Sequence, residues 1–412
     1  MAAEVRWLRR WGWLFPALGL PLGLLAFGGR WVFMTLDPVH WPDSARAWIT
    51  APGLALGLVI ALLPLLWRMG LYVENRWGGV IRRAGLAPLG AVGVFVCAEA
   101  ALRSPAGQET LWQSVRARSG ADFFAREVSL FRLDSVAQQR AAGLAPGIVV
   151  AGSSQMLHAM DPVRLAERTR RPVYRRAVAG MFPVELCAAS GYLDLHQENT
   201  LLLMVSGFDL GGRDRLYLDA IRPLATPAGV DLLIRAADWR FLFHQWRGFI
   251  DLSFAARCEA WRARDYVRYL LQHPFAAYAP SARASAGAEP AAQRDAYVRL
   301  GQNERMLAFS EAALDAFIGG MAGRVKSIVV FEGQVSPRYP GNEIHELSAR
   351  ARRRMESLAA AGRVVYIPLE KQELALSGAD WLDMAHVNEA GRMAYTEAFA
   401  RALQRLDEGN TP

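Results

Sequence analysis

The chain has 412 residues, of which 52% are hydrophobic, and its formal net charge at pH 7 is +8. No aromatic–basic repeat or nucleic-acid-binding motif accompanies that charge, so we do not expect nucleic acid as a partner. The 3 cysteines, Cys97, Cys187 and Cys258, have no zinc-like spacing and form no even framework. This pattern favours buried thiols, with a Cys187–Cys258 disulfide as the open alternative.

Three apolar stretches open the chain, at about 11–33, 48–67 and 86–102. Each is long enough to be considered as a helix crossing a hydrocarbon core of ~30 Å. The first is too long for the apolar part of a signal peptide, and no small-residue cleavage site follows it cleanly. The sequence therefore predicts a membrane region over residues 1–103 with three transmembrane helices.

Arginines predict how this region is oriented. They gather before the first apolar stretch and between the second and third, whereas the loop between the first two is neutral. By the positive-inside rule, the N-terminus and the second loop face the cytoplasm. We therefore expect a bacterial inner-membrane protein whose large domain is periplasmic. This prediction depends on the third stretch, where Glu99 would lie within about one turn of the outer surface.

Residues 104–144 are polar and helical in pattern, and we interpret them as a stalk. Beyond them, five short apolar runs alternate with helical patterns, and they are predicted as strands at 148–151, 173–178, 200–205, 325–331 and 363–367. This alternation predicts an α/β fold with a five-stranded parallel sheet between layers of helices over residues 145–412.

A long, largely helical insertion, at about 211–317, separates the third predicted strand from the fourth. Its part from Pro280 to Ala292 is rich in Ala, Pro and Ser and is typical of a mobile loop. An aromatic and arginine-rich cluster spans Trp239 to Arg247. Packing inside the insertion is the expected role of this cluster, and contact with a polymer or a membrane surface is the alternative.

A serine stands where the first strand meets the first helix, in the run Gly152-Ser153-Ser154. A tight turn at this place exposes the Ser154 Oγ and directs the backbone N–H groups after it towards an oxyanion. A plain serine N-cap is the alternative interpretation. His158 follows one helical turn later and is expected to be an exposed helix residue.

A second polar motif lies near the C-terminus, where Asp383 precedes His386 by three residues. The carboxylate can hold one ring nitrogen of the histidine, which leaves the other nitrogen free to take a proton from a serine. These residues predict a catalytic triad of Ser154, His386 and Asp383. The segment from Glu332 to Pro337 follows the fourth strand at the same sheet edge, as a simple loop or as part of the substrate pocket.

Together, Gly-x-Ser after the first strand and Asp-x-x-His before the last helix resemble the SGNH (GDSL-like) hydrolase superfamily. The resemblance covers roughly 147–406 and implies a three-layer α/β/α domain with Ser154 as nucleophile, His386 as base and Asp383 as orienting acid. Because Ser153 stands where many members have Asp, the chain resembles the membrane-anchored branch that acts in alginate O-acetylation and in the D-alanyl lipoteichoic acid system.

The resemblance also implies two oxyanion or pocket residues. Gly180 matches the glycine of the second block, although a plain turn glycine is the alternative. Asp209 stands where the third block usually has Asn, whose side chain donates a hydrogen bond. Because an ionised carboxylate cannot donate, three interpretations stay open for Asp209: it is protonated, it points away, or it holds another donor such as an arginine.

From these features we expect a membrane-anchored, serine-dependent O-acyltransferase, with acetyl as the expected group, that modifies an envelope or secreted polysaccharide. Neither a bound cofactor nor a metal is expected. The resemblance implies that a multi-spanning membrane O-acyltransferase supplies the acyl group, and membrane lipid is a further partner. An esterase acting on the same substrates and a non-catalytic polysaccharide assembly subunit are the alternatives.

Overall fold

The computed structural model describes part of the chain, namely residues 95–119, 123–140, 144–193, 196–211, 216–272, 303–338 and 342–409. Two compact units divide between Ala101 and Leu102, and all elements named below belong to the second unit. The predicted membrane helices at 11–33 and 48–67 lie outside the described residues, as do residues 86–94 of the third. Within the described ranges, no helix is both long enough and apolar enough to cross a membrane.

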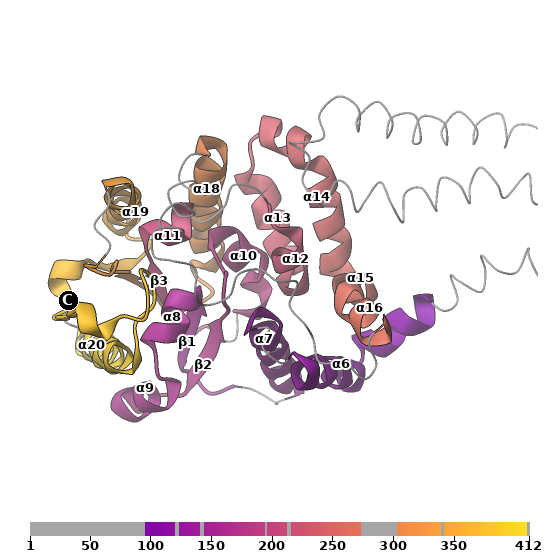
Figure 1. Cartoon of the computed structure of the whole chain (residues 1–412), viewed down its shortest axis with the longest axis horizontal. Coiled ribbons are helices and arrows are strands. Elements are labelled where there is room, and N and C mark those ends of the chain that lie inside the picture. The colour runs from indigo at the N-terminus through magenta and orange to yellow at the C-terminus, as the bar shows by residue number, and fades with distance from the viewer. Residues whose placement is uncertain are drawn as a thin grey trace, which may run out of the picture. The chain divides into compact units, whose positions relative to one another are not determined.

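One parallel sheet forms the centre of the second unit (Figure 1). Its order is β2-β1-β3-β4-β5, and every pair of neighbouring strands is parallel. The strands are β1 (Ile148–Gly152), β2 (Val173–Ala177), β3 (Thr200–Val205), β4 (Ser327–Glu332) and β5 (Val365–Ile367). The predicted α/β class and five-stranded parallel sheet are confirmed. The strand order reverses at β1 and β3, and such a reversal places the loops at the carboxyl ends of these strands around a common site.

Helices cover both faces of the sheet because successive strand side chains point in opposite directions. Val149 and Ala151 pack in one apolar cluster, whereas Ile148 and Val150 pack in another. The second cluster holds three helices, α8 (Ser154–Ala159), α9 (Pro162–Thr169) and α20 (Glu389–Asp407). The first, larger cluster holds α6 (Pro105–Arg118), α7 (Phe123–Arg140), α10 (Pro183–Ala188), α11 (Gly207–Gly211), α13 (Pro227–Ala236), α14 (Trp239–Arg257), α18 (Glu304–Met321) and α19 (Asn342–Ala360).

The segment that we predicted as a stalk is part of this folded unit. Ser104 caps α6, and Trp112 of α6 and Val128 of α7 are fully buried in the larger cluster. Both helices carry a buried apolar stripe within a mostly polar sequence, which is the pattern of a helix that packs on a core. The predicted division at residues 144 and 145 therefore does not separate two structural units.

The insertion is helical where it is described, and it includes α12 (Leu218–Ile221), α15 (Glu259–Arg262) and α16 (Arg264–Gln272) besides α13 and α14. The predicted end at residue 317 falls inside α18, whose Leu314, Phe317 and Ile318 are fully buried in the larger cluster. Parallel strands need a crossover element between them, and α18 leads into β4 in that role and packs against α10 and α13. The predicted mobile loop, Pro280–Ala292, lies outside the described residues.

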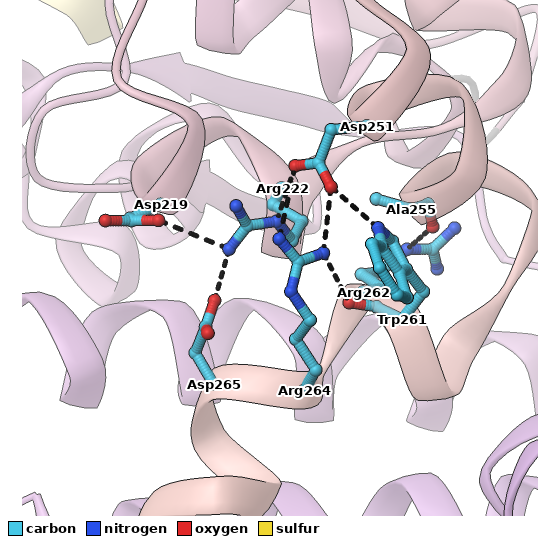
Figure 2. Close-up of polar contacts among 8 residues, drawn as sticks. All are labelled: Asp219, Arg222, Asp251, Ala255, Trp261, Arg262, Arg264 and Asp265. Carbon is cyan, nitrogen blue, oxygen red and sulfur yellow. Dashed lines mark hydrogen bonds and ion pairs between the residues drawn. The ribbon is translucent and has the colours of Figure 1, made fainter. Parts of the chain in front are cut away.

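A buried ionic cluster joins the insertion helices (Figure 2). Asp251 of α14 is 1% exposed and accepts hydrogen bonds from Arg222 Nε at 3.0 Å, Arg264 Nη1 at 3.0 Å and Trp261 Nε1 at 2.7 Å. Arg222 lies in the 3-10 turn η2 (Arg222–Leu224) and also contacts Asp219 and Asp265. The cluster thus fixes which face of α14 points inward.

Three further 3-10 turns complete the described elements: η1 (Ser190–Tyr192), η3 (Leu369–Lys371) and η4 (Gly378–Asp380). The three cysteines are free, with Cys187 buried and Cys97 exposed. The expectation of thiols rather than a Cys187–Cys258 disulfide is confirmed, although only Cys187 is fully buried.

Candidate active site

Ser154 is placed by the turn that joins β1 to α8. The strand ends at Gly152, whose φ of +140° is a backbone conformation that favours glycine. Ser153 then acts as the N-cap of α8, and its Oγ accepts a hydrogen bond from the Gln155 N–H at 3.4 Å. Ser154 follows as the first helical residue and is only partly buried. Both the cap and the exposed serine that the sequence predicted are therefore present, on neighbouring residues.

Asp383 and His386 lie in a tight loop just before α20. Trp381 and Val387 pair across this loop, and the Leu382 N–H donates to the His386 carbonyl at 2.8 Å. The Asp383 Oδ1 accepts hydrogen bonds from the N–H groups of Ala385 at 2.8 Å and His386 at 2.9 Å. The spacing of three residues thus folds the carboxylate back over its own turn and beside the imidazole.

These two segments bring the three predicted catalytic side chains into one hydrogen-bonded chain. The His386 Nδ1 lies 2.8 Å from Asp383 Oδ2, and its Nε2 lies 2.8 Å from Ser154 Oγ. Burial by itself would raise the pKa of Asp383, but hydrogen bonds from the His386 ring and from two backbone N–H groups outweigh it and hold that pKa below its usual value. A carboxylate that stays ionised fixes the His386 tautomer and leaves Nε2 free to accept the serine proton.

Gly180, the first predicted oxyanion residue, lies in the turn that follows β2. Strand β2 pairs with β1 up to the register Gly152 to Ala177, so this turn lies at the same sheet edge as Ser154. The φ of Gly180 is +71°, a left-handed conformation that side chains other than glycine rarely adopt. The turn interpretation therefore holds, and an oxyanion role stays a prediction.

Asp209, the second predicted oxyanion residue, is 4% exposed and bonded within its own loop. Its Oδ2 lies 2.8 Å from the Ser206 backbone nitrogen and 2.9 Å from Ser206 Oγ. Burial raises its pKa, and hydrogen bonds from Ser153 and from the Ser206 backbone N–H oppose that rise without cancelling it. The described partners of Asp209 therefore do not include the arginine that the sequence left open.

The hydrogen bonds around Ser206 indicate whether the Asp209 carboxyl carries a proton. The Gln155 Nε2 donates to the Ala385 carbonyl at 3.2 Å, so the other end of this amide, Oε1, faces Ser206 Oγ in a short hydrogen bond. The Ser206 hydroxyl has one proton, which this Oε1 must receive, because an amide oxygen only accepts. The contact between Ser206 Oγ and Asp209 Oδ2 then needs a proton from Asp209. Geometry and burial together indicate a neutral, protonated carboxyl.

Sequence reasoning missed Gln155 and Ser206. Their contacts connect three segments, namely the ends of β1 and β3 and the loop that carries His386. Both residues are buried, and the only sequence signal was adjacency: Gln155 follows Ser154 directly, and Ser206 ends the third apolar run. Gln155 and Ser206 have a positioning role, since they hold the turn that carries Ser154 against the loop that carries His386.

The loop after β4 also contacts the histidine loop. The Ser336 N–H donates to the Met384 carbonyl at 3.0 Å, and Val335 packs with Phe208, Met384 and Ala385. The expectation of a loop at 332–337 is confirmed. Its described contacts support the backbone around His386, and a direct contact with substrate stays a prediction.

His158 is not the exposed residue that the sequence predicted. Its ring is partly buried, and its centroid lies 4.7 Å from that of His386. Burial and the neighbouring His386 lower the pKa of His158 to about 4, so the ring is neutral near pH 7. The missed signal is the spacing of four residues from Ser154, which places His158 on the same side of α8.

Within the described residues, no group of three or more His, Cys, Asp or Glu side chains is arranged to hold a metal ion. Compared with family models, curated proteins and solved structures, the chain has no match in any of the three. What the site can do is therefore argued from its own geometry, which is that of an activated serine beside a histidine and a carboxylate.

Proposed function

We propose that the protein is a serine-dependent O-acyltransferase that transfers an acyl group, with acetyl as the expected group, to a hydroxyl of an envelope or secreted polysaccharide. The observation that carries this proposal is the hydrogen-bonded chain from Asp383 through His386 to Ser154 Oγ, with both contacts at 2.8 Å. A serine, a base and an orienting carboxylate in that geometry are the parts that acyl transfer through an acyl-serine needs.

In the first half-reaction, Ser154 Oγ attacks the carbonyl carbon of the acyl donor while His386 Nε2 takes the serine proton. The tetrahedral oxyanion collapses, the bond to the donor oxygen breaks, and His386 returns the proton to that leaving oxygen. Candidate oxyanion donors are the Ser154 N–H at the start of α8 and the Gly180 N–H. Ionised Asp383 stabilises the imidazolium that forms.

In the second half-reaction, a sugar hydroxyl attacks the acyl-serine. His386 takes the proton of that hydroxyl, the ester bond to Ser154 breaks, and the proton returns to Ser154 Oγ. The charge balance is the same in both halves, so no oxidant, reductant or metal is required. The same intermediate can instead be resolved by water, in which case the enzyme is an esterase.

Support for transfer, and for a polysaccharide acceptor, comes from the sequence. Three apolar stretches before residue 103 are more than an esterase needs as an anchor, and the arginine distribution favours a periplasmic domain. Because acyl-coenzyme A is cytoplasmic, the proposal includes a multi-spanning membrane partner that supplies the acyl group. Hydrolysis is the second candidate, since the side chains of His386 and Asp383 are 20% and 33% exposed and water reaches them.

The first experiment is covalent labelling with a fluorophosphonate probe in native membranes. We expect labelling of the wild-type protein and of the control Ser377→Ala, whose serine is exposed and lies in a capping box. Ser154→Ala and His386→Ala should both abolish labelling. Retained labelling in Ser154→Ala, or an unlabelled wild-type protein with its partner present, would contradict a serine mechanism.

A second experiment separates transfer from hydrolysis. The isolated acyl-enzyme is mixed with water alone or with a polysaccharide acceptor, and acyl-polysaccharide and free acid are both quantified. Acceptor-dependent loss of the acyl-serine with an acylated polymer as product supports the transferase. Equal loss with and without acceptor, with free acid as the product, assigns the protein to the esterases.

A further inference from the structure

One face of α14 exposes large aromatic side chains. Trp239, Phe243, Trp246 and Phe254 are 71%, 78%, 45% and 57% exposed. Their spacings of four, three and eight residues place all four on one side of a helix that makes 3.6 residues per turn. We call these four residues, together with Arg240 and Arg247, the α14 aromatic face.

The opposite side of α14 is held inward. Phe241 stacks on Phe309 of α18 with ring centroids 4.2 Å apart, and Asp251 is bound in the ionic cluster (Figure 2). Turning the helix to bury its aromatic face would take the Asp251 carboxylate away from Arg222 and Arg264, at the cost of breaking a buried ion pair. The aromatic face therefore stays at the surface of the second unit.

Arginines flank this face in contact with its indoles. The guanidinium carbon of Arg240 lies 5.3 Å from the Trp239 ring centroid, and that of Arg247 lies 5.2 Å from the Trp246 ring centroid. Large exposed apolar patches commonly mark an interaction site. Aromatic rings beside arginines match the boundary between lipid headgroups and acyl chains, where rings sit at headgroup depth and guanidinium groups bind phosphates.

The helix also ends near the place where the chain leaves its apolar N-terminal region. Arg103 Nη2 donates to the Arg257 carbonyl at 2.6 Å, at the C-terminal end of α14. Residues 86–102, the third predicted membrane helix, directly precede Arg103. The C-terminal end of α14 is therefore bonded to the residue that follows the third predicted membrane helix in sequence.

We propose that the α14 aromatic face lies on the surface of a lipid bilayer, with its four rings at the headgroup boundary and with Arg240 against anionic lipid phosphates. This contact is separate from the chemistry at Ser154 and gives the insertion a function of its own. It adds a second, peripheral membrane contact to the predicted N-terminal anchor.

The test uses the full-length protein in vesicles of phosphatidylcholine and phosphatidylglycerol. A fluorophore is attached at Phe243→Cys in a Cys97→Ser, Cys258→Ser background, in which the remaining Cys187 is buried. The matched control carries the same fluorophore at Val163→Cys on α9, a position that is 67% exposed and lies on the other side of the sheet. A phospholipid with a nitroxide near its headgroup then quenches any label that lies at that depth.

We expect the label at position 243 to be quenched about threefold more strongly than the label at 163, because collisional quenching requires residence at the interface. Arg240→Ser should reduce that quenching about twofold when phosphatidylglycerol is present, since a surface arginine contributes to anionic lipid binding. A label at Trp239→Cys should give the same result as position 243, which guards against a local effect of one substitution.

Equal quenching at 243 and 163 would overturn the proposal. So would a label at 243 that is shielded from aqueous iodide but not quenched by the lipid nitroxide, because a protein surface would then cover α14. Fluorophosphonate labelling of Ser154 in the same samples reports a folded catalytic unit. If Ser154 is still labelled but the lipid nitroxide does not quench the label at 243, the membrane contact is rejected and the proposed chemistry stands.

Discussion

The Asp383–His386–Ser154 chain and the Asp251 cluster are both built from carboxylates and their hydrogen-bond donors, yet they differ in where they lie. Asp251 is 1% exposed, and its partners come from neighbouring helices of the insertion. Asp383 and His386 are 33% and 20% exposed, and their partner Ser154 is 232 residues away in sequence from His386. A buried ion pair orders helices, whereas an accessible chain of hydrogen bonds at a sheet edge can transfer a proton to a ligand.

The two groups also differ in whether their polar atoms are already fully occupied by hydrogen-bond partners from the protein. Each Asp251 oxygen accepts from the guanidinium groups of Arg222 or Arg264 or from the Trp261 indole, so the cluster has no capacity left for a ligand. Within the triad, only Asp383 is saturated. The Ser154 oxygen ends the chain, and Ser154 is only partly buried, which suits a nucleophile.

Acyl transfer should be most sensitive to substitution of His386, the proposed base. His386→Ala should lower the rate of acyl transfer by about 10⁶-fold, because serine and histidine act as one unit. His158→Ala, one ring away, should keep activity within about tenfold, since its neutral imidazole makes no contact with Ser154 that the mechanism uses. Single-turnover kinetics on both variants checks this difference, and comparable losses would assign a catalytic role to His158.

Asp383→Asn should lower the rate by about 10⁴-fold while leaving the fold intact, because the amide holds the wrong histidine tautomer. The same substitution at Asp251 should affect stability and leave the chemical step unchanged. Measured rates and thermal midpoints for the two variants check the contrast. An active Asp383→Asn enzyme would show that His386 is oriented by its backbone alone.

Asp251→Ala should destabilise the protein by about 3 kcal/mol, because Arg222, which is 3% exposed, loses its buried carboxylate and keeps only the more exposed Asp219 and Asp265. Asp219→Ala is the matched control, because Asp219 also contacts Arg222 but its side chain is 89% exposed. This substitution should change stability by less than about 1 kcal/mol. Chemical denaturation measures both. Equal losses would mean that burial does not distinguish the two carboxylates.

Asp209→Asn should cost less than Asp209→Ala, because the amide oxygen can still accept from the Ser206 N–H. Since the pKa of Asp209 is raised, the folded state binds the extra proton, and wild-type stability falls as pH rises. The Asn variant has no such titration and should not show this fall. Asp209→Ala should cost about 1–3 kcal/mol, since it leaves the Ser206 N–H unpaired. A wild-type stability that follows the Asn variant as pH rises would contradict a protonated Asp209.

The smallest effect concerns His158 and pH. Its pKa is about 4 in the folded protein and 6.5 in its ordinary state, so the unfolded chain binds more protons between these values. The stability that the neutral ring contributes is thus present above about pH 6.5 and is lost as pH falls towards 4. Because the ring is only partly buried, we expect about 1 kcal/mol. His158→Gln should flatten this part of the stability–pH curve, and an unchanged curve would remove the ring as its cause.

Much of the fold could be predicted because its signals are local. All five strands were predicted within two residues of their observed bounds. The signal was clearest for runs such as β1 and β3, since a buried parallel strand is apolar on both faces, whereas the edge strand β2 contains two arginines. Ser154, Asp383 and His386 could be named for a similar reason. Each lies at a strand-to-helix turn or in a loop before a helix, where a side chain reaches the edge of a parallel sheet.

The contacts that were missed depend on pairing between distant segments. Gln155, Ser206 and Asp209 are ordinary polar residues until β1 and β3 become neighbours and bury them together. The environment of His158 depends on a loop more than two hundred positions later. The helices at 105–140 looked like a stalk because their buried stripe is narrow and their composition is polar.

By itself, the sequence determined the α/β class, the strands and the three residues of the triad, because periodicity and turn chemistry act over a few neighbours. The packing of distant segments was needed to show that Ser154 and His386 lie in hydrogen-bond contact, that Asp209 is bonded to Ser206, and that α14 presents its aromatic residues outward. The physical reason is that proton positions, burial and exposure belong to the packed environment around a side chain, which distant segments supply together.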